Sequence, residues 1–291
     1  MTGKSINLFL MDGDPNGRIK CTLANWTGVA YKIPRTMLEK AKNISYLQQT
    51  GVYLLFGTSN ETSNPIVYIG QAGIRKNGQG ILNRWEEHKR NSNKDWWMEA
   101  VALTTSNNSF GATEISYLEN RFRNMAIKAE RYEVMNGNDP THGNLTEEKE
   151  SEMEEFISYA RLVIGALGYK VFEPLIASKD EVNHQDALND EPVLLSRRRS
   201  ANAKAKRTSE GFVLLRGSKI SEGYVKSAPR WVHELREKNA AFIQTDGTIT
   251  RDLLFSSPSA AAAFVAGGSA NGLIEWKTED GRTLKELEAE S

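Results

Sequence analysis

The sequence is poor in cysteine, in surplus charge and in long apolar runs. Cys21 is the one cysteine among 291 residues, so the chain cannot form an intrachain disulfide or a thiolate zinc cluster, which fits a reducing compartment. The apolar run near the N-terminus is too short for a secretory signal. The longest uncharged stretch, residues 253–274, contains a proline, two adjacent glycines and several serines, unlike a membrane span. We therefore expect a cytoplasmic protein with no membrane partner.

The absence of net charge hides a strong division along the chain. The 37 basic residues balance 37 acidic ones, whereas nucleic-acid-binding proteins are usually basic. The balance is +4 in residues 1–50, 0 in 51–140, −8 in 141–195, +6 in 196–207 and −2 in 208–291. A nucleic-acid partner is therefore not excluded, because basic segments flank a neutral one.

The pattern of predicted elements indicates an α+β fold in about two domains, by a prior of roughly 150 residues each. Residues 1–50 predict an N-terminal extension: a hairpin of strands 6–10 and 18–23, then a helix over 34–48 with Met37, Ala41, Ile44 and Leu47 on one face. Residues 51–173 predict a small three-stranded antiparallel sheet flanked by helices. Its strands are expected at 51–57, 66–70 and 99–105, and its helices at 81–90, from near Thr113, and at 147–167.

The remaining residues predict a linker and a second domain. Residues 174–207 have little apolar content at their basic end and predict a polar and basic linker. Residues 208–291 predict a small α+β domain with strands 212–215 and 273–277 and helices 229–238 and 259–266.

Several side chains in residues 51–140 have the chemistry that phosphodiester hydrolysis requires. Tyr53 and Tyr68 lie on neighbouring predicted strands, and Arg84 and His88 share one face of a helix at spacing i, i+4. Glu119 lies at the edge of an apolar helical stripe, where a carboxylate is rarely buried without a partner. Together they could supply a hard oxygen ligand for a metal, a cation for the phosphate, and groups that move protons.

At this point the sequence resembles the GIY-YIG nuclease superfamily. The shared pattern is Gly51-Val52-Tyr53, Tyr68-Ile69-Gly70, the helix ILNRWEEHKR, the glutamate of ISYLENRF and the asparagine of VMNGNDP, which is Asn136. The resemblance covers about residues 50–140 and implies a DNA endonuclease that uses a single Mg²⁺, with Mn²⁺ as an alternative. RNA is not excluded as a substrate.

The resemblance also implies a role for each matching residue. Glu119 would hold the metal ion and Arg84 would stabilise charge on the scissile phosphate. Tyr53 would activate water, Tyr68 and His88 would orient groups or assist proton transfer, and Asn136 would position the site. The products would be a 5′-phosphate and a 3′-hydroxyl.

The sequence departs from the family pattern after the second tripeptide. Gln71 stands where relatives often carry a small residue or a lysine, so Lys76 is a candidate substitute that would contact nucleic acid. Arg198 and Arg199, in the basic part of the linker, are further candidate phosphate contacts. From Gly211 onward the chain is similar to a small domain of unknown function found C-terminal to such nuclease domains.

Each of these residues also has an ordinary structural interpretation. The tyrosines could be half-buried strand aromatics, Arg84 and His88 surface side chains of a helix, Asn136 a turn residue, and residues 196–207 a solvated linker. Glu114 is a rival metal ligand, although its place in the first helical turn favours a capping role. A catalytically inactive nucleic-acid-binding module and a protein-interaction scaffold therefore stay open as alternatives, and so does a protein partner or a homodimer.

Overall fold

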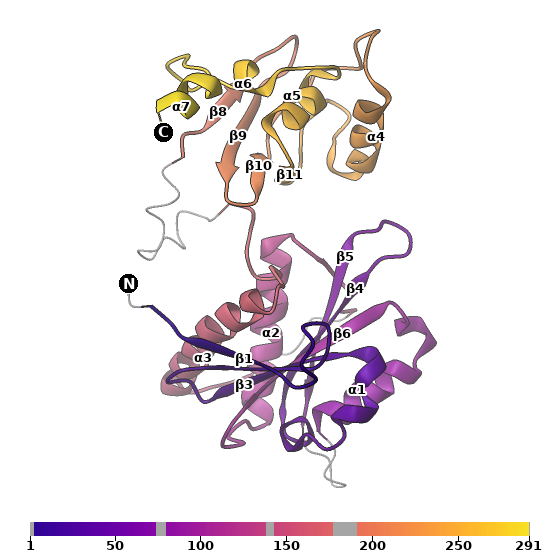
Figure 1. Cartoon of the computed structure of the whole chain (residues 1–291), viewed down its shortest axis with the longest axis vertical. Helices are drawn as coiled ribbons and strands as arrows, with labels where there is room; N and C mark the ends of the chain where they lie inside the picture. The colour runs from indigo at the N-terminus through magenta and orange to yellow at the C-terminus, as the bar shows by residue number, and fades with distance from the viewer. Residues whose placement is uncertain (1–2, 74–79, 138–142, 177–190, 291) are drawn as a thin grey trace. The chain divides into compact units, whose positions relative to one another are not determined.

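The chain forms two compact units, residues 2–174 and residues 175–291 (Figure 1). The structure is a computed structural model that describes residues 3–73, 80–137, 143–176 and 191–290. No helix in these ranges is long and apolar enough to cross a membrane.

The first unit is built on a seven-stranded sheet with the order β1-β2-β3-β6-β4-β5-β7. All neighbours pair antiparallel except β5 and β7, which pair in parallel through two residues of each strand. The strands are β1 (Ile6–Leu10), β2 (Ile19–Leu23), β3 (Gly28–Pro34), β4 (Gly51–Thr58), β5 (Pro65–Ala72), β6 (Trp97–Thr105) and β7 (Glu133–Val134).

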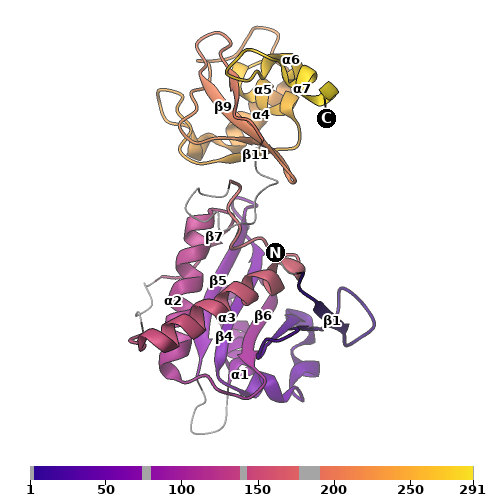
Figure 2. The ribbon, with the colours of Figure 1, turned by 90° about the vertical axis from the view of Figure 1, so that its left-hand side faces the viewer.

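Helices cover both faces of this sheet, and each face has its own hydrophobic core. On one face, α2 (Ala112–Ala129) and α3 (Glu147–Ala166) pack on alternate residues of the central strands, such as Val52 and Leu54 (Figure 2). On the other face, α1 (Ile81–Arg90) packs on the residues between them, such as Tyr53 and Leu55. Because successive side chains of a strand point to opposite faces, one strand contributes to both cores.

The expected three-stranded sheet is the centre of a larger one. Strands β4, β5 and β6 pair as the expected antiparallel set, but three strands from residues 1–50 extend it on one side and β7 extends it on the other. Residues 1–50 are therefore part of the same sheet. The hairpin of β1 and β2 is confirmed, whereas β3 was not predicted.

The helix expected over residues 34–48 is replaced by three short 3₁₀ turns, Arg35–Met37, Glu39–Ala41 and Ser45–Gln48. Their backbone bonds run from Ala41 N to Leu38 O, from Ile44 N to Ala41 O and from Leu47 N to Ile44 O. The residues joined by these bonds recur at every third position and are all buried: Leu38, Ala41, Ile44 and Leu47. A spacing of three fits a 3₁₀ helix as well as one face of an α-helix, which explains the wrong prediction.

The second unit contains a four-stranded antiparallel sheet with the order β11-β10-β9-β8 and a separate hydrophobic core. Its strands are β8 (Leu194–Ser196), β9 (Ala203–Thr208), β10 (Gly211–Leu214) and β11 (Leu253–Phe255), and its helices are α4 (Arg230–Lys238), α5 (Pro258–Ala266), α6 (Gly272–Glu275) and α7 (Leu284–Glu290).

Two expectations for this unit are wrong. The basic residues 196–207, expected in a linker, belong largely to β9 and to the turn before it, because Ala203 and Ala205 alternate with lysines and fill the core. The strand expected at 273–277 is instead the short helix α6, whose start is capped by the Asn271 side chain accepting from Leu273 N at 3.1 Å. Of the five residues of the expected strand, Lys277 is in β-bridges, to Leu195 and to Thr283.

Candidate active site

The centre of the candidate site is a buried hydrogen bond between Tyr53 on β4 and His88 on α1. The phenolic oxygen and Nε2 lie 2.7 Å apart, and the two side chains are almost inaccessible to solvent. Burial, aided by the nearby charges of Lys94 and Arg84, lowers the pKa of His88 to about 4, so the imidazole is neutral at pH 7. Burial also raises the pKa of Tyr53 far above its usual range, so the phenol keeps its proton.

Gly70 on β5 makes room for the Tyr53 ring. The two residues are directly opposite each other in the β4–β5 pair, and a Cβ at Gly70 would lie 2.5 Å from Cζ and from the phenolic oxygen of Tyr53. Tyr68 projects from the same face of β5, with its ring centroid 6.3 Å from that of Tyr53 and 5.1 Å from that of His88. The glycine of the second tripeptide is thus required by the tyrosine of the first.

Two cations lie beside the tyrosines. Arg84, one turn before His88, pairs with Glu87 at 2.6 Å and remains about one-third exposed. Its charge opposes the rise in the pKa of both Tyr53 and Tyr68. Lys94 follows α1, and its Nζ lies 3.4 Å from the centroid of the Tyr68 ring. Burial, together with the charge of Arg84, lowers the pKa of Lys94 to about 8.

Lys94 was not found by the sequence analysis. It lies at the end of the 3₁₀ turn Ser92–Lys94, four residues beyond the last residue of α1, and has no periodic relation to the other site residues. Its position depends on how the chain returns from α1 to β6. A polar turn directly after a helix that carries Arg84 and His88 was the one available signal.

Glu119 reaches the site from α2. Its Oε2 accepts a hydrogen bond from Nε2 of Gln71 on β5 at 2.8 Å. Burial raises the pKa of Glu119, while the bond from Gln71 and the charge of Arg84 oppose the rise. The carboxylate in turn raises the pKa of both tyrosines, which places it within electrostatic reach of their phenols. Gln71, the departure from the family pattern, therefore orients the candidate metal ligand.

The donor set at Glu119 suits a metal that is held partly by its substrate. Within the described part of the chain, no group of three or more histidines, cysteines, aspartates or glutamates is placed to hold a metal ion. Magnesium is often bound through one or two carboxylates, with waters and substrate phosphates completing its shell. One partly buried carboxylate beside an arginine fits that mode, and it does not fit a cage made of protein ligands.

Asn136 holds the edge of β5 beside the tyrosines. Its Oδ1 accepts from Ile69 N at 3.1 Å, and its Nδ2 donates to Ile69 O at 2.6 Å. Strand β7 pairs with β5 only at Ile66 and Val67, so the Asn136 side chain continues the pairing between Tyr68 and Gly70. Asn136 is therefore placed as a positioning residue.

The other candidate residues lie elsewhere. Glu114 caps α2 by accepting from Gly111 N at 3.0 Å. Lys76 is outside the described residues. Arg198 and Arg199 belong to the second unit, where Arg198 pairs with Glu275 at 2.7 Å and Arg199 donates to the carbonyl oxygen of Ala266 at 3.2 Å.

Comparison with known proteins gives a family match that lies in the second unit. Residues 194–288 match a family described as a domain of unknown function (DUF4357). The match begins at the first residue of β8, earlier than the boundary expected at residue 208. No curated protein and no solved structure matches the chain.

Proposed function

We propose that the first unit is a metal-dependent endonuclease of the GIY-YIG type that hydrolyses phosphodiester bonds of DNA. The observation that carries the proposal is the meeting of Tyr53, His88, Tyr68 and Arg84 with Glu119, which come from β4, α1, β5 and α2. An ordinary surface helix and an ordinary strand would not bring a neutral buried Tyr–His pair beside an arginine and a partly buried carboxylate. Perturbed groups of this kind concentrate at functional sites.

In this proposal, phosphate recognition belongs to Arg84 and Lys94, and Glu119 holds Mg²⁺ or Mn²⁺. Arg84 is partly exposed and can turn its guanidinium from Glu87 to a phosphate oxygen. When bound, the metal ion would act as a Lewis acid on the scissile phosphate. Gln71 keeps the Glu119 carboxylate oriented before the ion arrives.

The Tyr53–His88 pair offers a path for the proton that the attacking water loses. Tyr53 is inaccessible in the free protein, so this path requires substrate binding to admit the attacking water to its phenol. As the water oxygen bonds to phosphorus, its proton then passes to the phenolic oxygen of Tyr53, and the phenol's own proton moves along the 2.7 Å bond to Nε2 of His88. The negative charge of the entering phosphate raises the pKa of His88 and favours this transfer. Tyr68, which is partly exposed beside the pair, protonates the departing 3′ oxygen, which leaves a 5′-phosphate and a 3′-hydroxyl.

Nicking of supercoiled plasmid in the presence of Mg²⁺ or Mn²⁺ tests the proposal. Glu119→Gln keeps the volume and a polar partner for Gln71 but removes the charge, and we expect it to lower the cleavage rate by about 10³-fold or more, as for loss of one strong electrostatic contact. Glu114→Gln is the matched control, since this glutamate lies on the same helix and only caps it. Defined DNA and RNA strands then show which polymer is cut.

If neither the wild type nor Glu119→Gln nicks the plasmid with either metal, the result would contradict the proposal. The chain would then be better described as a nucleic-acid-binding module without catalysis, or as an interaction scaffold if it also fails to bind DNA at low salt.

A further inference from the structure

The four-stranded sheet of the second unit carries its hydrophobic core on one face. Its core face carries Leu194, Ala203, Ala205, Phe212 and Leu214, which pack with α5 and Trp276. Because side chains alternate across a strand, the residues between them point to the opposite, outer face. Lys204, Lys206 and Leu254 belong to this outer face and are exposed or half-buried, whereas Val213 between Lys206 and Leu254 is fully buried.

Positive residues from distant parts of the chain meet on this outer face. Lys204 is opposite Leu195 in the β8–β9 pair, and Leu195 is bridged on its other side by Lys277. Lys206 is opposite Val213, which is opposite Leu254. Asn202 continues the outer face of β9 and is bridged by Lys219. These strand pairs and bridges place four lysines on one surface: Lys204, Lys206, Lys219 and Lys277. We call this surface the basic sheet face.

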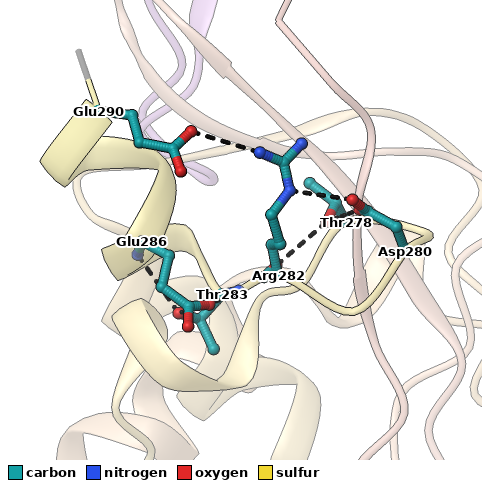
Figure 3. A network of polar contacts seen from close by, with 6 residues as sticks. All are labelled: Thr278, Asp280, Arg282, Thr283, Glu286 and Glu290. Carbon is teal, nitrogen blue, oxygen red and sulfur yellow. Dashed lines mark hydrogen bonds and ion pairs between the residues drawn. The ribbon is translucent and has the colours of Figure 1, made fainter.

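Carboxylates do not neutralise the two central lysines. Within the described part of the chain, Lys204 and Lys206 form no ion pair, whereas the core-side Arg207 is paired with Glu191 at 2.7 Å. Two of the acidic residues after Lys277 bond to other groups: Arg282 donates to Asp280 at 2.9 Å, and Glu286 accepts from Thr283 N at 2.7 Å (Figure 3). The hydrogen bonds from Thr283 lower the pKa of Glu286, and the charge of Lys277 nevertheless contributes to this shift. Lys204 and Lys206 therefore keep their charge available for an external anion, whereas Lys277 and Lys219 lie within electrostatic reach of Glu286 and Asp246.

The apolar residues of the same face restrict which anion would fit. They are aliphatic, and no aromatic side chain stands among the described residues of the face: Val193, Leu195, Val213 and Leu254. Binding of single strands usually relies on bases stacked on aromatic rings. A face of spaced lysines without rings suits a regular row of phosphates instead, which neutralises cations without reading sequence.

We infer that the basic sheet face is a sequence-independent binding surface for the phosphate backbone of duplex DNA. The inference rests on the proposed function only in taking DNA as the ligand. Its residues lie in the second unit, outside the proposed nuclease site, and binding needs no cleavage. It is separate from the contacts predicted at Arg198 and Arg199, which stay a prediction; these guanidinium groups bond to Glu275 and to the carbonyl oxygen of Ala266 within the unit.

Binding of the full-length chain to a labelled duplex of arbitrary sequence, in EDTA and over a series of salt concentrations, tests this inference. The variant Lys204→Gln/Lys206→Gln/Lys277→Gln should bind at least about ten-fold more weakly at low salt, and the slope of log K against log salt should become shallower by about 0.9 for each lysine that contacts a phosphate. The control Lys226→Gln/Lys238→Gln/Lys285→Gln removes three exposed lysines of the same unit that lie off this face. We expect it to bind as the wild type does.

The outcomes separate this inference from the nuclease proposal. Unchanged binding by the first variant, equal losses in both variants, or no binding by the wild type would overturn the inference. Competition by polyglutamate as strong as competition by duplex DNA would assign the face to acidic polypeptides and overturn it too. Lysine-dependent binding without any plasmid nicking would support the inference and contradict the nuclease proposal. Circular dichroism and thermal unfolding confirm that both variants are folded.

Discussion

At the scale of single residues, the Tyr53–His88 pair shows how burial sets chemistry. A neighbouring carboxylate usually makes a histidine a better base, and Glu87 acts on His88 in this direction. Burial and the cations Lys94 and Arg84 outweigh it, so the pKa of His88 falls. A tyrosine in the same place cannot lose its proton without a partner. The pair is therefore neutral at rest, and a negative substrate is what would make proton transfer favourable.

The lowered pKa of His88 predicts a pH dependence of stability. The unfolded chain binds a proton at this residue near pH 6.5, and the folded protein does so only near pH 4. Between these values the unfolded state holds more protons, so the free energy of unfolding falls as the pH is lowered, by on the order of 3 kcal/mol in total. Urea denaturation of the wild type and His88→Gln across this window measures it.

In His88→Gln, which cannot titrate, this part of the pH dependence should disappear. His233→Gln on α4 of the second unit is the control, since it removes an imidazole that lies outside the candidate site. An equal pH dependence in the wild type and His88→Gln would show that burial does not hold the imidazole neutral.

The sequence predicts much of the candidate site and misses a specific part of it. Tyr53, Tyr68, Arg84 and His88 were chosen from spacing and resemblance, and the structure brings them together because the register of β4 and β5 and the packing of α1 follow from local patterns. Lys94 was missed because its position depends on a turn between elements. Contacts that cross from a loop to a strand leave no period in the sequence.

At the scale of elements, the β4–β5 pair is built around a glycine and an aromatic ring that face each other. Tyr53 is fully buried, and its ring crosses the place where any other residue at position 70 would put its Cβ. An aromatic side chain that covers a cross-strand glycine fixes the register of the two strands. It also fixes the position of the phenol relative to Tyr68.

Gly70→Ala should therefore disturb the site more than the sheet. The added Cβ must displace the Tyr53 ring, and overpacking of this kind costs about 1–3 kcal/mol. In a Tyr53→Ala background the same change should cost almost nothing, so a double-mutant cycle measured by urea denaturation should give a large coupling. Gly137→Ala is the control, because no atom lies within 4 Å of its added Cβ.

Additive effects of Gly70→Ala and Tyr53→Ala would show that the glycine is needed for another reason, such as backbone conformation. The wild-type bond between Tyr53 and His88 would then not depend on the residue at position 70.

Elements were predicted well where one period dominates and poorly where two periods fit. The bounds of α1 agree with the prediction, because Gly80 precedes it and Ile81, Leu82 and Trp85 are buried at helical spacing. Helix α3 differs from the prediction by one residue at its end, because Thr146 caps its start and its first turn is acidic. The helix predicted over residues 34–48 was wrong because a repeat of three fits two kinds of helix. The strand predicted over residues 273–277 was wrong because a short apolar run after Asn271 fits a strand as well as one capped turn.

At the scale of the whole molecule, the neutral total charge is repeated in each unit. Residues 1–174 and residues 175–291 each contain equal numbers of basic and acidic side chains. Attraction to a polyanion must therefore come from the local arrangement of charge and not from the net charge of either unit. The basic sheet face supplies such an arrangement in the second unit, and Arg84 with Lys94 does so in the first.

Separate hydrophobic cores predict that the fragment ending at Pro174 folds without the rest of the chain. The two cores of the first unit contain no residue beyond position 174, and the core of the second unit begins at Leu194. Urea unfolding followed by tryptophan fluorescence should show one cooperative transition in the fragment, which contains Trp26, Trp85, Trp96 and Trp97.

The full chain should show that same transition together with a second one from the other unit. The fragment should also bind duplex DNA with a shallower salt dependence than the full chain, because it lacks the basic sheet face. A fragment that unfolds without cooperativity would mean that the second unit contributes to the stability of the first. A fragment that binds with the full salt dependence would place the phosphate contacts on the first unit, and the four lysines of the sheet face would then have no part in holding DNA.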